Sequence, residues 1–350
     1  MSDWDRVKDL EVRIDDYVLE RLEEDVSSDF TRVSTVIRTS GGGEEGIGED
    51  VVYDAVDHDA AQQDGPVLPI TGHWTLEGLS NHLAGLDLFP GKAPERDVSR
   101  LYRRYAYESA ALDLALRQAG TSLHALVGRE PRPLTYVVSL RLGEPPSLDP
   151  VTSRLRNYPG LRFKLDPTAS WTDDLVAELA ATGAIDSVDF KGHYKGTVVD
   201  NPPDVGLYRR VLEALPDAWI EDPHLDDAVQ RFLEPHRDRV TWDAPIHGIA
   251  DIEALPFPPK MVNVKPSRVG SLKELFATYE YCDERGIGMY GGGQFELGPG
   301  RGQIQLLASI YHPDTPNDVS PSGFHSPNPP PGIPESPLPP QAHERGFRWG

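Results

Sequence analysis

The chain has 350 residues, which is enough for two domains or for one barrel with an attached module. Its formal charge of −22 argues against a nucleic-acid partner, because phosphate binding needs clustered Lys and Arg. A single cysteine, Cys282, excludes an internal disulfide framework and a zinc site built from cysteines.

The amino-terminal segment carries no sign of export. It reads MSDWDRVKDLEV, which is acidic and lacks the apolar core of a secretory signal. No stretch of the sequence approaches 18 apolar residues, so no membrane span is expected. We therefore expect a soluble cytoplasmic protein that binds neither nucleic acid nor membrane.

The first 130 residues are expected to form an α+β module. Residues 8–55 carry β-branched residues in partial alternation, which is typical of antiparallel strands, and residues 41–43 are glycines that supply a turn. Residues 94–128 have Ala and Leu at spacings of three and four, which predicts a helix with Gly120 as its C-cap.

From about residue 131 to 325, short apolar runs alternate with helical stretches. Strand–helix repetition of this kind predicts a parallel sheet, and seven or eight units favour a modified (β/α)8 TIM-type barrel. The alternative, an open doubly wound sheet, usually binds its ligand at one switch point. The runs are LTYVVSL, LRFKL, SVDF, AWIED, RVTWD, KMVNVK and GIGMYGG.

The tail, residues 326–350, contains the proline-dense segment SPNPPPGIPESPLPP. Such a segment cannot form a regular helix or a central strand. It could be a ligand for a proline-recognition module, but packing along its own protein is the commoner outcome. Because the closing GFRW is apolar, we expect the tail to pack back on the capping module.

Five of the barrel runs end on a charged residue. They end at Lys164, Asp189, Glu221, Asp243 and Lys265, about 20 to 30 residues apart, the length of one strand plus one crossover helix. One acid alone would be an ordinary exposed strand end or helix cap. Five in register predict a shared site, because the carboxyl ends of barrel strands open into one bowl.

The three acids, Asp189, Glu221 and Asp243, are candidate metal ligands. Their hard oxygens, together with waters and a substrate carboxylate, could complete an octahedral Mg²⁺ shell. Zinc is disfavoured, since no His-x-His pair or His/Cys cluster ends a strand.

The two lysines are candidate bases on opposite faces of a bound carbon acid. Lys164 lies two residues after Arg162, so both side chains are expected on one strand face. Burial, Arg162 and a nearby cation should lower the pKa of Lys164 towards working pH. The alternative is that Lys164 and Lys265 both extend to solvent.

These residues carry a family likeness. FKLD, SVDF, WIEDP, TWDAP, VNVKPSRVGSL and GMYGGGQFELGPG resemble strand ends of the enolase superfamily. Within it they look like the muconate-lactonizing-enzyme-like subgroup of the mandelate racemase/muconate lactonizing enzyme family, which includes o-succinylbenzoate synthases and dipeptide epimerases. The resemblance implies that Asp189, Glu221 and Asp243 bind Mg²⁺. Lys164 matches the second lysine of the family's Lys-x-Lys motif, and Lys265 matches its sixth-strand lysine.

The resemblance implies Mg²⁺-dependent abstraction of the proton α to a substrate carboxylate, through an enediolate that the metal stabilises. Racemisation or epimerisation, cycloisomerisation and β-elimination all share this step. We expect a small-molecule carboxylate substrate and a homo-oligomer. By the same analogy, the capping loops over residues 20–30 and 48–54 should set specificity.

The chain also departs from the family pattern. Arg162 replaces the first lysine of Lys-x-Lys, Lys191 replaces the usual Asn, Ala244 replaces a common Glu, and HYKGTVVDNPPD lengthens the loop after Asp189. A degenerate barrel that binds a carboxylate without turnover therefore stays open as an alternative, as does a different metal-dependent lyase or hydrolase.

The glycine run at 291–293 could bind an anion, although a rim turn is its commoner role. Further residues expected beside the substrate are Arg162, Lys191, Asp222, Gly292, Gln294 and Glu296.

Overall fold

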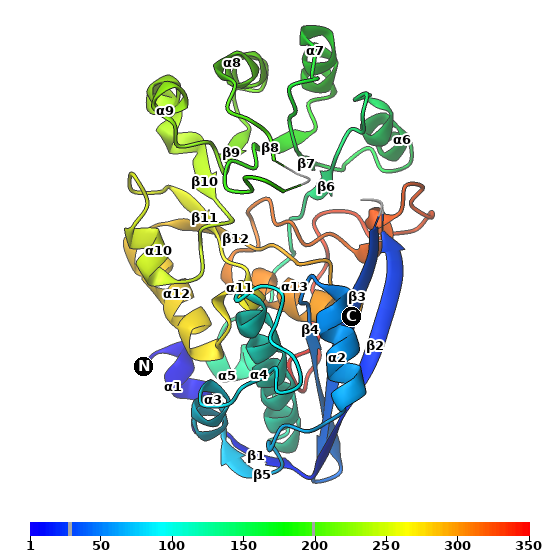
Figure 1. Cartoon of the computed structure of the whole chain (residues 1–350), viewed down its shortest axis with the longest axis vertical. Coiled ribbons are helices and arrows are strands. Elements are labelled where there is room, and N and C mark those ends of the chain that lie inside the picture. The colour runs from blue at the N-terminus through cyan, green and yellow to red at the C-terminus, as the bar shows by residue number, and fades with distance from the viewer. Residues whose placement is uncertain (27–29, 198–199) are drawn as a thin grey trace.

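The two larger sheets of the molecule are of different kinds, one antiparallel and one parallel and curled (Figure 1). The computed structural model describes residues 1–26, 30–197 and 200–350. Residues 27–29 of the expected capping loop, and residues 198–199 of the lengthened loop, lie outside this part of the chain. Among the described residues, no helix is long and apolar enough to cross a membrane.

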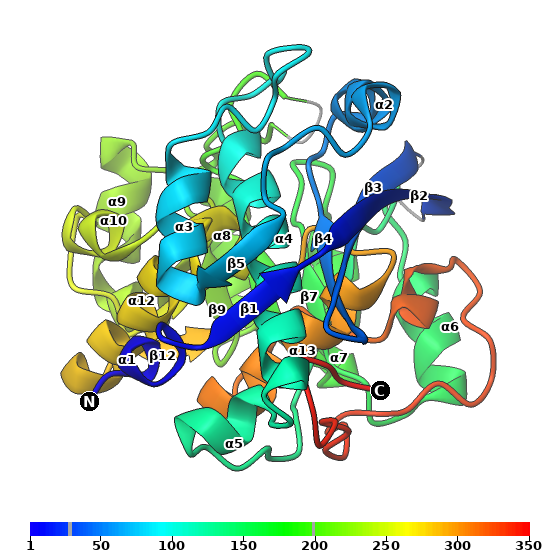
Figure 2. The ribbon, with the colours of Figure 1, turned by 90° about the horizontal axis from the view of Figure 1, so that it is seen from below.

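The amino-terminal domain is a three-stranded antiparallel meander that packs on one long helix, α4 (Ser99–Gln118). The helix expected over 94–128 is two helices, because Gly120 has a left-handed φ of 68° and ends the first. A second, two-stranded sheet, β1 with β5, lies beside the same helix (Figure 2). The remaining elements are α1 (Asp3–Val7), β1 (Glu11–Ile14), β2 (Asp16–Val26), β3 (Phe30–Gly41), β4 (Glu44–Asp50), α2 (Ala55–Asp64), β5 (Gly72–Thr75), α3 (Leu76–Ala84) and α5 (Leu123–Val127).

The seven apolar runs form seven parallel strands in sequential order, β6 to β12. Most of their residues are buried, as a sheet between a packed interior and covering helices requires. The strands are β6 (Val138–Leu140), β7 (Phe163–Leu165), β8 (Ile185–Asp189), β9 (Trp219–Glu221), β10 (Val240–Trp242), β11 (Met261–Asn263) and β12 (Gly288–Tyr290).

Residues 317–318 fill the position between the first and last of these strands. Asn317 forms a parallel bridge with Tyr136 beside β6, and Asp318 forms one with Gly292 beside β12. The predicted modified barrel with a capping domain is therefore confirmed, and the open doubly wound sheet is not. The connecting helices are α6 (Asp149–Asn157), α7 (Asp173–Thr182), α8 (Val205–Ala214), α9 (Asp227–Leu233), η1 (Glu234–Arg239), α10 (Ile249–Glu253), α11 (Pro266–Val269), α12 (Leu272–Arg285), α13 (Pro299–Tyr311) and η2 (Ser322–His325).

The carboxyl-terminal tail runs back along the protein. Leu338 bridges Leu134 where the chain enters the barrel, and Gly346 bridges Ser122 just before α5. Near its end, the Phe347 N–H donates to the buried carboxylate of Asp113 on α4 at 2.8 Å. The extended segment thus lies against both the barrel entrance and the main helix of the capping domain.

Candidate active site

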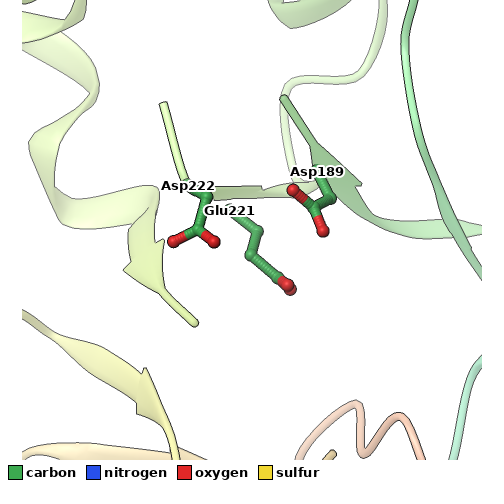
Figure 3. Close-up of side chains that lie close together, drawn as sticks. All are labelled: Asp189, Glu221 and Asp222. Carbon is green, nitrogen blue, oxygen red and sulfur yellow. The ribbon is translucent and has the colours of Figure 1, made fainter. Parts of the chain in front are cut away.

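Three buried carboxylates gather at the carboxyl ends of β8 and β9 (Figure 3). Ligand oxygens of Asp189, Glu221 and Asp222 all lie within 4.8 Å of one another, and each residue is 0% exposed. One oxygen, Glu221 Oε2, has no hydrogen-bond partner among the described residues. A cluster of hard oxygens with one left unpartnered fits a divalent cation such as Mg²⁺.

Strand register decides which acids point into the barrel. Asp189 pairs with Glu221, and Glu221 pairs with Thr241 of β10. Because side chains alternate along a strand, Asp243, two residues after Thr241, belongs to the same inner face. Asp222 directly follows Glu221, so alternation alone would not put its side chain on this face. Its backbone is left-handed, with φ 45°, and its carboxylate lies with those of Asp189 and Glu221.

Asp222 and Asp243 have different partners. The Asp222 carboxylate accepts backbone N–H bonds from Asp243 and Ala244, each at 2.8 Å. Burial, with Asp243 and Asp189 nearby, raises the pKa of Asp222 to about 7. The Asp243 carboxylate instead binds Lys265 Nζ at 2.9 Å and Arg268 Nη1 at 2.7 Å. Burial opposes ionisation of Asp243, but these two cations outweigh it and hold its pKa well below the usual range.

Lys164 contacts two members of the carboxylate group. Its ammonium donates to Glu221 and lies 3.4 Å from Asp189 Oδ2 and 3.4 Å from Asp318 Oδ2. The sequence argument predicted a lowered pKa for Lys164, and the structure contradicts it. Burial does act to lower the pKa, but Glu221, Asp318 and Asp189 outweigh burial and raise it well above its ordinary value.

Lys191 is the second lysine at the carboxylate group. Its ammonium pairs with Asp189 Oδ2, and its backbone N–H donates to Asp189 Oδ1 at 3.0 Å. The Lys191 ammonium also lies 3.6 Å from Asp166 Oδ1. The departure from Asn at this position therefore places a cation directly on one of the candidate metal ligands.

Arg162 does not join the site. Its guanidinium binds Asp186 and the Gly183 carbonyl at the amino end of the strands, with its side chain 40% exposed. The register between β7 and β8 shifts between Phe163 and Lys164, which leaves Asp186, the partner of Arg162, without a paired residue on β7.

The glycine segment after β12 shapes the pocket for Lys265. A Cβ on Gly292 would lie 2.5 Å from Lys265 Cε and 2.8 Å from Asn263 Nδ2, so a larger residue there would force one of these side chains to shift. Gln294 Nε2 donates to Tyr102 OH of α4 at 3.2 Å, which ties this segment to the capping domain. Glu296 accepts the Gln294 N–H at 2.7 Å and pairs with Arg301 at 3.2 Å.

Three functional candidates were missed from the sequence: Asp318, Arg268 and Asp166. Asp318 lies in the short run NDVS, which has no strand-like pattern, and reaches Lys164 only through barrel closure. Arg268 lies on α11, within VNVKPSRVGSL, and not at a strand end, and it pairs with Asp243. Asp166 follows Lys164 by two residues, and that spacing was a signal that could have been used.

Family models described as a domain of unknown function (DUF8230) match this chain with their N-terminal domain over residues 5–126 and their C-terminal domain over residues 130–326. The chain is also 26% identical to an o-succinylbenzoate synthase of Bacillus subtilis over 226 residues. That match covers 61% of this chain and 58% of the relative, so it spans less than two thirds of that enzyme's length.

Solved structures show the fold. A member of the enolase superfamily from Listeria innocua matches with a TM-score of 0.69 and 18% identity, covering 89% of this chain and 86% of the other. A dipeptide epimerase from Methylococcus capsulatus, complexed with a Mg ion, matches with a TM-score of 0.63 and 19% identity over 90% of this chain and 88% of its own. The expected resemblance is confirmed at the level of the fold, and these named relatives are enzymes.

Proposed function

We propose that this chain, which belongs to the DUF8230 family and has the fold of the enolase superfamily, removes the proton α to a substrate carboxylate with the help of Mg²⁺. The observation that carries the proposal is a group of buried carboxylates at the strand ends in which Lys164 pairs with Glu221 and Lys265 pairs with Asp243. The proposal names the substrate by its class, a small α-substituted carboxylate.

Asp189 and Glu221 are proposed as two of the metal ligands, with Asp243 as the third. Asp243 shares their inner face, whereas both oxygens of Asp222 already accept backbone N–H bonds that hold the end of β10. A bound Mg²⁺ would stabilise the negative charge that develops on the substrate carboxylate as the α-proton leaves.

The two lysines are proposed to act on opposite faces of the substrate. Lys164, which pairs with Glu221 and Asp189, is proposed to move a proton at one face of the α-carbon. Lys265, held by Asp243 in the space that Gly292 leaves open, is the group proposed to remove the proton from the other face. Arg268 pairs with Asp243 and fixes the carboxylate that Lys265 contacts.

The fate of the intermediate stays open among epimerisation, cycloisomerisation and β-elimination, because all three begin with the same proton transfer. The relatives' named activities, o-succinylbenzoate synthase and dipeptide epimerase, are the first reactions to assay. A homo-oligomer and a cytoplasmic location stay predictions.

A second candidate function is carboxylate binding without turnover. It is favoured by one observation, the Lys191 ammonium seated on Asp189, because this cation neutralises a residue that the metal needs.

The test is proton exchange in D₂O. The protein is incubated with a panel of α-substituted carboxylates, with and without Mg²⁺, and deuterium at the α-carbon is measured by NMR. We expect Mg²⁺-dependent exchange that Lys164→Ala and Lys265→Ala each remove at one face of the α-carbon and that the double substitution abolishes. Binding without exchange in any compound would favour the second candidate, and exchange that survives both substitutions would refute the two-lysine assignment.

A further inference from the structure

Lys191 holds both oxygens of one candidate metal ligand. Its backbone N–H binds Asp189 Oδ1 at 3.0 Å and its ammonium binds Asp189 Oδ2. An ammonium on Asp189 Oδ2 repels a divalent cation at the same oxygen, because the two carry like charges. Binding of the proposed metal therefore favours movement of Lys191 away from that oxygen.

The ammonium has little access to water once it leaves. The Lys191 side chain is 17% exposed, and the Tyr194 ring covers it, with Nζ 5.5 Å from the ring centroid. A partly buried cation that loses its partner is costly, so Lys191 needs a second anion within reach.

Asp166 supplies that second anion. It is 8% exposed, and its Oδ2 accepts from Arg141 Nε at 3.1 Å. Its Oδ1 has no hydrogen-bond partner among the described residues, yet lies 3.6 Å from Lys191 Nζ. A small rotation of the lysine side chain would convert this near contact into a hydrogen bond.

We propose that Lys191 is a two-position counter-ion that pairs with Asp189 when the metal is absent and with Asp166 Oδ1 when the metal is bound. The inference rests on the metal site of the proposed function. Lys191 then competes with the metal for Asp189, and Asp166 weakens that competition by holding the displaced ammonium. By thermodynamic linkage, whatever stabilises Lys191 on Asp189 lowers metal affinity, and whatever stabilises it on Asp166 raises metal affinity.

The test measures Mn²⁺ binding by calorimetry and by the electron paramagnetic resonance signal of free Mn²⁺, on the full chain at one pH. Lys191→Met should bind Mn²⁺ about tenfold more tightly than the wild type, and Asp166→Asn about tenfold more weakly. In the Lys191→Met background, Asp166→Asn should change affinity by about twofold at most, because no ammonium remains to be held. Lys195→Met removes an exposed charge from the same loop and should leave affinity within about twofold.

Equal Mn²⁺ affinity in the wild type and Lys191→Met would overturn the inference and leave the proposed function standing. An Asp166→Asn effect of the same size in both backgrounds would also overturn it. Absence of Mn²⁺ binding in the wild type and in every variant would contradict the metal site of the proposed function. Lys191→Asn provides a second variant, and thermal unfolding of each protein checks that it is folded.

Discussion

The strands β7 and β8 carry an ion pair at each end, and the two pairs differ in exposure. At the amino end, the side chains of Arg162 and Asp186 are 40% and 23% exposed. At the carboxyl end, those of Lys164 and Asp189 are 3% and 0% exposed. Water screens the first pair, so this pair contributes little to the free energy of unfolding. At the second pair, burial acts to lower the pKa of Lys164, but Glu221, Asp318 and Asp189 outweigh burial and raise it.

The largest expected effect compares the two basic residues of this strand. Lys164→Met should lower Mg²⁺-dependent exchange by about 10³-fold for the enantiomer whose α-proton faces Lys164, because it removes the group that moves that proton. Arg162→Met should leave the rate within about twofold, since its guanidinium binds Asp186 at the far end of the strand. NMR exchange rates for both variants provide the measurement, and equal losses would show that the two ends are not functionally different.

Burial also controls proton uptake at His312, whose Nδ1 shares a 2.7 Å hydrogen bond with Asn317 Oδ1. Burial lowers its pKa from 6.5 to about 4, so the unfolded chain takes up the proton first. The associated stability is fully present above pH 6.5 and is lost as pH falls towards 4, amounting to about 3 kcal/mol. Urea unfolding between pH 7 and 4 should show that the free energy of unfolding falls less with pH in His312→Asn than in the wild type. Parallel plots of unfolding free energy against pH for the two proteins would contradict this.

A smaller effect is expected from crowding beside Lys265. Gly292→Ala places a Cβ 2.5 Å from Lys265 Cε and should cost about 2 kcal/mol of unfolding free energy. Gly248→Ala is the matched control, since a Cβ there meets nothing within 4 Å, and its change should stay within about 0.5 kcal/mol. Chemical denaturation of both variants tests the difference, and a tolerated Gly292→Ala would mean that Lys265 has room to move.

The smallest effect is expected at the exposed pair. Asp186→Ala should lower the free energy of unfolding by less than about 1 kcal/mol, because its partner Arg162 can turn to water. α-Proton exchange should be unchanged. A loss of several kcal/mol would mean that exposure is a poor guide to the value of these pairs.

Much of the fold could be predicted because each barrel strand is a short apolar run with its own local signal. The same signal located Lys164, Asp189 and Glu221, since each closes a run and strand ends meet in a barrel. Arg162 was placed beside Lys164 from the period-two pattern alone, which does not encode its contacts with Asp186 and the Gly183 carbonyl at the start of β8. The pKa of Lys164 was predicted in the wrong direction because Asp318, one of the acids that raise it, comes from a distant segment with no strand pattern.

The most direct test of the central claim is anomalous X-ray diffraction from a crystal of the protein grown with Mn²⁺. The account predicts one Mn²⁺ peak coordinated by the carboxylates of Asp189 and Glu221, with the Lys191 ammonium on Asp166. No peak at these strand ends, or a peak bound only by exposed acids elsewhere, would contradict it.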